Sequence, residues 1–209
     1  MSTQRSDETE PTTPDFIGCA WKEFPKDADV VRYSVDEKNP RIATKVDGGG
    51  YSTIIGNTPL PPNKVVSWSI KILNSKNNNG YCILIGVAPS DIDLNNLDNY
   101  YKCGWYFDCY ASKVCSGPPH NCIWPGKEYG PMKEQGQYVH TGDSVGVVMD
   151  TEKGELAFAL NGEIFGVAFE GIPLDKPLVP CVLIGWNGDS VELDTPDVKE
   201  KENGGCIIS

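Results

Sequence analysis

Apolar and polar residues alternate with a period of two along much of this chain. Between Val66 and Ile72 every second residue is apolar, and the same pattern runs from Val31 to Val35. Because successive side chains of a strand point to opposite faces, both stretches are predicted to be half-buried strands. The nearly continuous apolar run 81–88 is typical of a strand buried on both faces. The turn-forming cluster Asn74–Gly80 precedes it, so we expect the strands on either side to form a hairpin.

The strongest local signal is GELAFALNGEIFGVAF, residues 154–169. Here Asn161-Gly162 supplies the positive φ angles of a tight type I′ turn between two alternating runs, which predicts a hairpin. Further strands are predicted at GDSVGVVMD, LVPCVLIGW and SVELD. Strands at such short spacing indicate an all-β sandwich or barrel.

Composition and length favour one folded domain. The chain has 209 residues, 39% of them apolar, and its 22 glycines and 16 prolines leave little room for long helices. Residues 1–14 are polar and acidic and are expected to be a disordered tail, whereas 15–194 form the domain. Residues 195–209 are expected to be a flexible tether.

The net charge and the cysteines limit the classes of function and the cellular compartment to be expected. A net charge of −11 argues against nucleic-acid binding, which needs clustered Lys and Arg. The N-terminus has no signal-peptide character and no apolar run reaches the roughly 18 residues of a membrane span, so we expect a cytoplasmic protein. In that compartment the eight cysteines are expected to be reduced thiols.

Several motifs, taken in order and spacing, resemble the SPRY domain over about residues 20–194. They are Ile85–Val87, Gly104–Tyr106, GDSVGVVMDTEKGELAFALNGEIFGVAFEGI (142–172) and Pro177–Pro180. The resemblance implies two antiparallel sheets packed face to face, with loops at one end that recognise a short peptide or a protein patch. It also implies no catalysis and no cofactor.

Carried over by position, the resemblance places recognition loops at 44–51, 99–101 and 185–187. The residues expected to contact a partner are Lys45, Asp47, Tyr51, Tyr100, Tyr101, Trp186 and Asn187. Trp186 is the first choice because rigid aromatic anchors dominate interfaces. The alternative readings are a Trp packed in or beside the core, tyrosines that only cap the sandwich, and a Gly48–Gly50 run that is a mere connection.

Other chemistries find less support. Cys103, Cys109, Cys115, His120 and Cys122 lie within twenty residues, but they lack the Cys-X-X-Cys spacing of a structural zinc site, so no metal is expected. A thiol enzyme would need a Cys–His pair in a recognisable motif, and none occurs. A carbohydrate-binding sandwich stays open as an alternative, because exposed Trp and Tyr beside Asn and Asp can stack on sugars.

The last four residues, Cys206–Ser209, form a C-a-a-X box ending in Ser, the pattern that directs farnesylation of the Cys. A prenyltransferase and possible capture by a prenyl-binding carrier are therefore expected as partners of Cys206. One isoprenoid gives only marginal membrane binding, and the acidic domain is repelled by anionic lipid, so reversible contact with a peripheral membrane pool is expected.

Overall fold

The computed structural model describes residues 18–25, 31–47, 49–94, 104–117, 120, 126–130, 139–194 and 197–199, the last three by their backbone. Within these residues the regular structure is β-strand. The strands are β1 (Tyr33–Val35), β2 (Ile42–Lys45), β3 (Ser52–Ile55), β4 (Val65–Asn74), β5 (Ile83–Pro89), β6 (Trp105–Asp108), β7 (Lys113–Ser116), β8 (Lys127–Glu128), β9 (Ser144–Asp150), β10 (Glu155–Leu160), β11 (Glu163–Phe169), β12 (Leu178–Ile184), β13 (Ser190–Leu193) and β14 (Asp197–Lys199).

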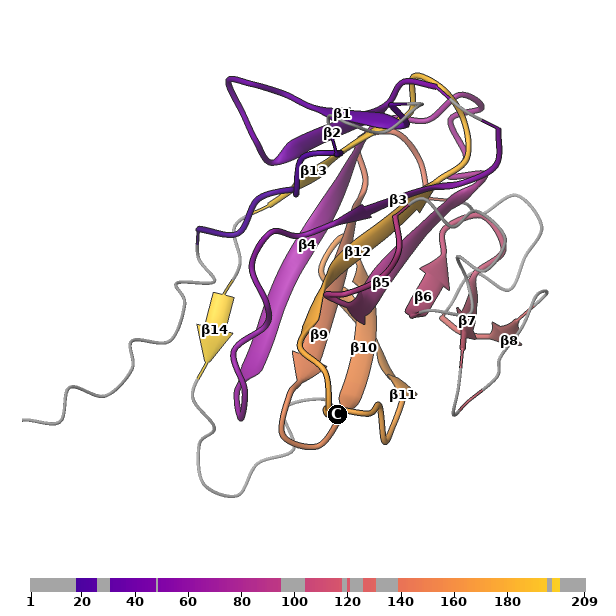
Figure 1. Cartoon of the computed structure of the whole chain (residues 1–209). Coiled ribbons are helices and arrows are strands. Elements are labelled where there is room, and N and C mark those ends of the chain that lie inside the picture. The colour runs from indigo at the N-terminus through magenta and orange to yellow at the C-terminus, as the bar shows by residue number, and fades with distance from the viewer. Residues whose placement is uncertain are drawn as a thin grey trace, which may run out of the picture.

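The strands form two antiparallel sheets packed face to face (Figure 1). The 8-stranded sheet has the order β1-β2-β13-β4-β9-β10-β11, with β14 also pairing with β4. The 6-stranded sheet has the order β3-β12-β5-β6-β7-β8. The expected all-β sandwich of two antiparallel sheets is confirmed.

The hairpin predicted over 154–169 is confirmed as β10–β11. Its turn residues Asn161 and Gly162 have φ angles of 50° and 90°, as a type I′ turn requires. Leu160 pairs with Glu163 across the turn, and β9 pairs with β10 on the other side. The alternating sequence therefore encodes a three-stranded meander at one end of the larger sheet.

The expected hairpin around Asn74–Gly80 is wrong. β4 pairs with β13 and β9 in the larger sheet, whereas β5 pairs with β12 and β6 in the smaller one. The turn-forming residues reverse the chain as predicted, but they carry it across the sandwich instead of into a neighbouring strand. The segment 75–82 is thus a crossover between sheets.

A second difference concerns the boundary at residue 195. Asp197–Lys199 pairs as β14 with Val65–Ser67 of β4, inside the segment expected to be a flexible tether. β13 occupies the same edge of β4 only from Ile70 to Asn74, so the start of β4 is open to another strand. The pairing of β14 with β4 uses backbone groups, so the polar side chains of this segment gave no sign of a strand.

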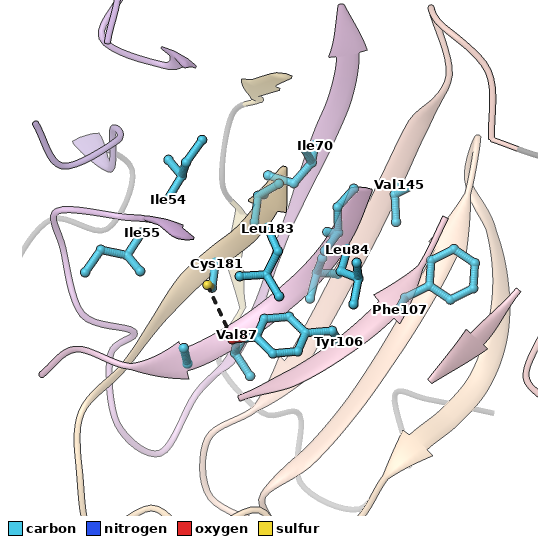
Figure 2. Packing of buried hydrophobic residues seen from close by; sticks show 14 of the residues in the cluster. Ile54, Ile55, Ile70, Leu84, Val87, Tyr106, Phe107, Val145, Cys181 and Leu183 are labelled. Atoms are coloured by element: carbon cyan, nitrogen blue, oxygen red, sulfur yellow. Dashed lines mark hydrogen bonds between the residues drawn. The ribbon is translucent and has the colours of Figure 1, made fainter. Parts of the chain in front are cut away.

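The core lies between the sheets (Figure 2). Ile70 and Val145 come from the larger sheet, and Leu84 and Leu183 come from the smaller one; each is at most 3% exposed. Tyr106 is fully buried and its hydroxyl lies 3.6 Å from Cys181 Sγ. The predicted two-sided burial of the 81–88 run holds for Ile83–Ala88. No helix among the described residues is long and apolar enough to span a bilayer.

Candidate functional site

Three crossovers between the sheets lie side by side at one end of the sandwich. β2, β13 and β4 are neighbours in the larger sheet, and β3, β12 and β5 are neighbours in the smaller one. The connections 46–51, 185–189 and 75–82 each join one strand of the first set to one of the second. The strand order therefore places 185–189 between the other two.

Hydrogen bonds hold the central crossover to both neighbours. The Gly188 amide donates to the Lys45 carbonyl at 2.8 Å, and the Lys45 amide donates to the Asp189 carbonyl at 3.0 Å. On the other side the Gly185 amide donates to the Cys82 carbonyl at 2.9 Å. The three segments are thus fixed relative to one another before any partner binds, which lowers the entropic cost of binding.

An open pocket of about 480 Å³ lies among these segments. We call it the crossover pocket. Its lining residues are Gly49, Gly50, Tyr51, Lys76, Cys82, Gly185, Trp186 and Asn187. Its size is that of a small-ligand or side-chain pocket.

Aromatic rings form one wall and the adjoining rim. Trp186 is half-buried, and its ring centroid lies 6.3 Å from that of Tyr81, which is 38% exposed. Tyr81 in turn meets Tyr110 edge-to-face at 4.9 Å. The Trp186 Nε1 atom is buried and has no hydrogen-bond partner within the described part of the chain. The ring is therefore held in place by packing, with its indole N–H buried beside the Cys82 thiol.

Cys82 and Gly185 make the close approach that shapes the floor of the pocket. A Cβ atom on Gly185 would lie 2.6 Å from the Cys82 Cβ, so only glycine fits there. Cys82 itself adopts the left-handed conformation, with φ of 62°. Burial raises the pKa of its thiol, and hydrogen bonds with Tyr51 and Tyr81 offset that only in part. A raised pKa leaves less thiolate at neutral pH, the opposite of an activated nucleophile.

Asp189 is the last residue of the central crossover, and its side chain is fully buried. Its Oδ1 accepts a 2.7 Å hydrogen bond from the Lys76 amide, whereas Oδ2 has no partner among the residues described. Burial raises the pKa of this carboxyl to about 6, although the Lys76 amide and ammonium favour the charged form. The Asp189 carboxylate thus connects the central crossover to the 75–82 crossover, and burying its charge costs folding free energy.

Of the residues predicted to bind a partner, Tyr51, Trp186 and Asn187 meet in the crossover pocket. Lys45 is 1% exposed, so its side chain lies under the 46–51 crossover and does not reach the surface. Asp47 is exposed on that crossover but does not line the pocket. Tyr100 and Tyr101 lie outside the described residues, so their predicted contacts stay predictions.

Lys76, Tyr81 and Cys82 were not predicted. No sequence signal pointed to these residues because 74–80 has the composition of a hairpin turn. A hairpin would keep this segment within one sheet, away from the other two crossovers. Recognising the crossover requires the pairing partners of β4 and β5, which are distant in sequence. The 75–82 side of the pocket can therefore be recognised only from strand pairing between segments distant in sequence.

The Cys/His stretch gives no metal cluster within the described residues. Cys109 and Cys115 are buried and form no disulfide among the described residues, and Cys103 and Cys122 lie outside the described ranges. His120 Nδ1 accepts a hydrogen bond from Trp105 Nε1 at 3.2 Å, and Nε2 donates to the Glu170 carbonyl at 2.6 Å. With both nitrogens engaged, His120 serves to connect β6 with the end of β11.

Comparison with known proteins identifies the domain. The sequence model of the SPRY domain matches residues 65–196. The protein named SPRY domain-containing SOCS box protein 1, from Homo sapiens and from Bos taurus, is 28% identical over 110 residues. That match covers 49% of this chain and 38% of the relative. This chain therefore spans well under two thirds of the relatives' length.

Solved structures agree on the fold. The SPRY domain of human HERC1 superimposes with a TM-score of 0.59 at 20% identity, covering 78% of this chain and 94% of that one. A human SPRY domain gives a TM-score of 0.56 at 15% identity, covering 78% and 95%. At such identities the likeness concerns the fold alone.

Proposed function

Because the chain belongs to the SPRY domain family, whose domains are protein-interaction modules, we propose that it is a non-catalytic adaptor that binds a protein segment or short peptide in the crossover pocket. The observation that carries the proposal is the preformed pocket with an aromatic wall. It lies among three crossovers that backbone hydrogen bonds hold together. A partner's side chain entering it would meet the Trp186 ring and polar groups of Tyr51 and Asn187.

Peptide display with the intact chain tests this proposal. Selected peptides should bind the wild-type protein and lose about thirtyfold or more in affinity against Trp186→Ala, as for an interface anchor. Ile164→Ala is the matched control, because Ile164 is an exposed apolar residue on β11, at the far edge of the larger sheet. Equal affinities for the two variants would contradict the proposal. Glycan binding that needs Trp186, with no peptide enriched, would favour the carbohydrate alternative instead.

We also propose that Cys206 is prenylated and that the modified protein is cytoplasmic with a reversible membrane-bound pool. The support is the Cys206–Ser209 box and the single, weak lipid signal that it provides. Intact mass and detergent partitioning of the protein from eukaryotic cells should show an isoprenyl adduct that is absent from Cys206→Ser. An unmodified mass would remove the lipid from the account and leave the recognition proposal standing.

A further inference from the structure

The crossover pocket differs in charge from the rest of the molecule. The chain carries a net charge of −11, yet among the described residues that line the pocket Lys76 is the charged one. None of those lining residues carries a carboxylate, and Asp189, the acidic residue of the central crossover, is fully buried. A partner entering the pocket therefore meets a positive charge.

The Lys76 ammonium is held in a defined place. Its Nζ lies 3.9 Å from the centroid of the Trp186 ring, a cation–π contact, and its backbone amide is fixed by Asp189 Oδ1. Lys76 is exposed, and among the described residues no carboxylate oxygen lies within ion-pair distance of its ammonium. The ring orients the cation and leaves its donors available.

Two further cations lie by the 46–51 crossover. The buried Lys45 Nζ donates to Ser52 Oγ at 2.9 Å and to the Asp47 carbonyl at 3.2 Å, both neutral oxygens. Burial lowers its pKa, and the nearby charge of Arg32 lowers it further, against the effect of Asp47. The Arg32 Nε is buried without a hydrogen-bond partner in the described part of the chain. Lys45 and Arg32 thus place two cationic side chains beside the 46–51 crossover, next to the pocket.

We infer that the partner of the crossover pocket is an acidic peptide segment, with an Asp or Glu carboxylate on Lys76 and an adjacent apolar or aromatic side chain against Trp186 and Tyr81. The inference rests on the proposed recognition function and adds the chemistry of the ligand. A carboxylate at the rim would complete the charge pairing that the chain leaves open. The net charge of −11 disfavours binding of an acidic segment without a local cation such as Lys76.

Peptide display on wild type and on Lys76→Glu tests the inference. Wild type should enrich peptides with Asp or Glu at a fixed position next to an apolar residue, and Lys76→Glu should bind them about tenfold or more weakly. Replacing the enriched acid by Lys should restore affinity for Lys76→Glu. Lys153→Glu is the matched control, because this exposed lysine lies in the β9–β10 turn, at the other end of the sandwich.

Two results would overturn the inference while sparing the recognition function. They are enriched peptides that need Trp186 but carry no acidic residue, and acidic peptides that bind Lys76→Glu and Lys153→Glu equally well. Enriched peptides that bind Trp186→Ala as well as wild type would instead overturn the recognition function and the inference together. A thermal unfolding midpoint of Lys76→Glu close to that of wild type verifies that the substitution changed the charge and left the fold intact.

Discussion

Individual residues of the pocket were predictable where their role depends on local sequence. Trp186 follows a long apolar strand and precedes Asn187-Gly188, so a rigid ring at a loop could be expected. Lys45 shows the limit of this reasoning: a lysine beside glycines suggests a surface charge, yet its ammonium is bound by Ser52, seven residues later, and is buried. Burial of a long side chain depends on the packing of the next strand, which its neighbours in sequence do not reveal.

Asp189 gives a residue-scale prediction about pH. Its folded pKa of about 6 exceeds the ordinary value of 3.8, so the native protein binds this proton more tightly than the unfolded chain does. The Asp189 carboxyl therefore lowers the free energy of unfolding progressively as pH rises from about 4 through 6, and its effect is constant at higher pH. We expect Asp189→Asn to be more stable than wild type at pH 7.5 by about 1–3 kcal/mol, with the difference shrinking toward pH 4. Urea unfolding of both proteins at several pH values measures it; a variant less stable by the same amount at every pH would contradict the account.

Cys82 gives a prediction about thiol chemistry. Because burial raises the pKa of Cys82, its alkylation at pH 7.5 should be slower than that of a small-molecule thiol and should accelerate as the pH is raised. Peptide mapping by mass spectrometry distinguishes Cys82 from the other cysteines, with Cys82→Ser as the control. Fast alkylation at neutral pH would revive the thiol-enzyme alternative.

At the scale of elements, the apolar pattern predicts strands well and their pairing poorly. The period-2 run Val66–Ile72 lies in β4, and the nearly continuous run 81–88 gave β5, which begins two residues later at Ile83, because burial imposes these patterns directly. The turn between them was misassigned because Asn, Ser and Gly reverse a chain equally well within a sheet and between sheets. β10–β11 was predictable because Asn161-Gly162 specifies a two-residue turn that admits only a hairpin.

Contact between β5 and β6 depends on a glycine. A Cβ atom on Gly86 would lie 1.8 Å from the Trp105 carbonyl oxygen, so the backbones must separate to admit it. We expect Gly86→Ala to lower the free energy of unfolding by about 3 kcal/mol or more. Gly146→Ala on β9 is the matched control: its Cβ would approach the Ala159 Cβ most closely, at 3.1 Å, and the substitution should cost about 1 kcal/mol or less. Chemical unfolding of the two variants compares them; equal losses would contradict the structure of the β5–β6 pair.

At the scale of the whole molecule, the order of strands in two sheets creates the pocket. The adjacency of β2-β13-β4 in one sheet and β3-β12-β5 in the other brings three crossovers together, and each contributes one side. The resemblance to the SPRY domain pointed to two of these segments, 44–51 and 185–187. The third follows only from pairing between strands about a hundred residues apart in sequence, as β12 with β5.

The most direct test of the central claim is nuclear magnetic resonance of the isotope-labelled protein during titration with an acidic peptide enriched by display. The account predicts that the largest amide shifts fall at 49–51, 76–82 and 185–187, and that Trp186→Ala removes them. Saturable shifts confined to another surface, such as β11 at the far edge of the larger sheet, would contradict the assignment of the crossover pocket as the binding site.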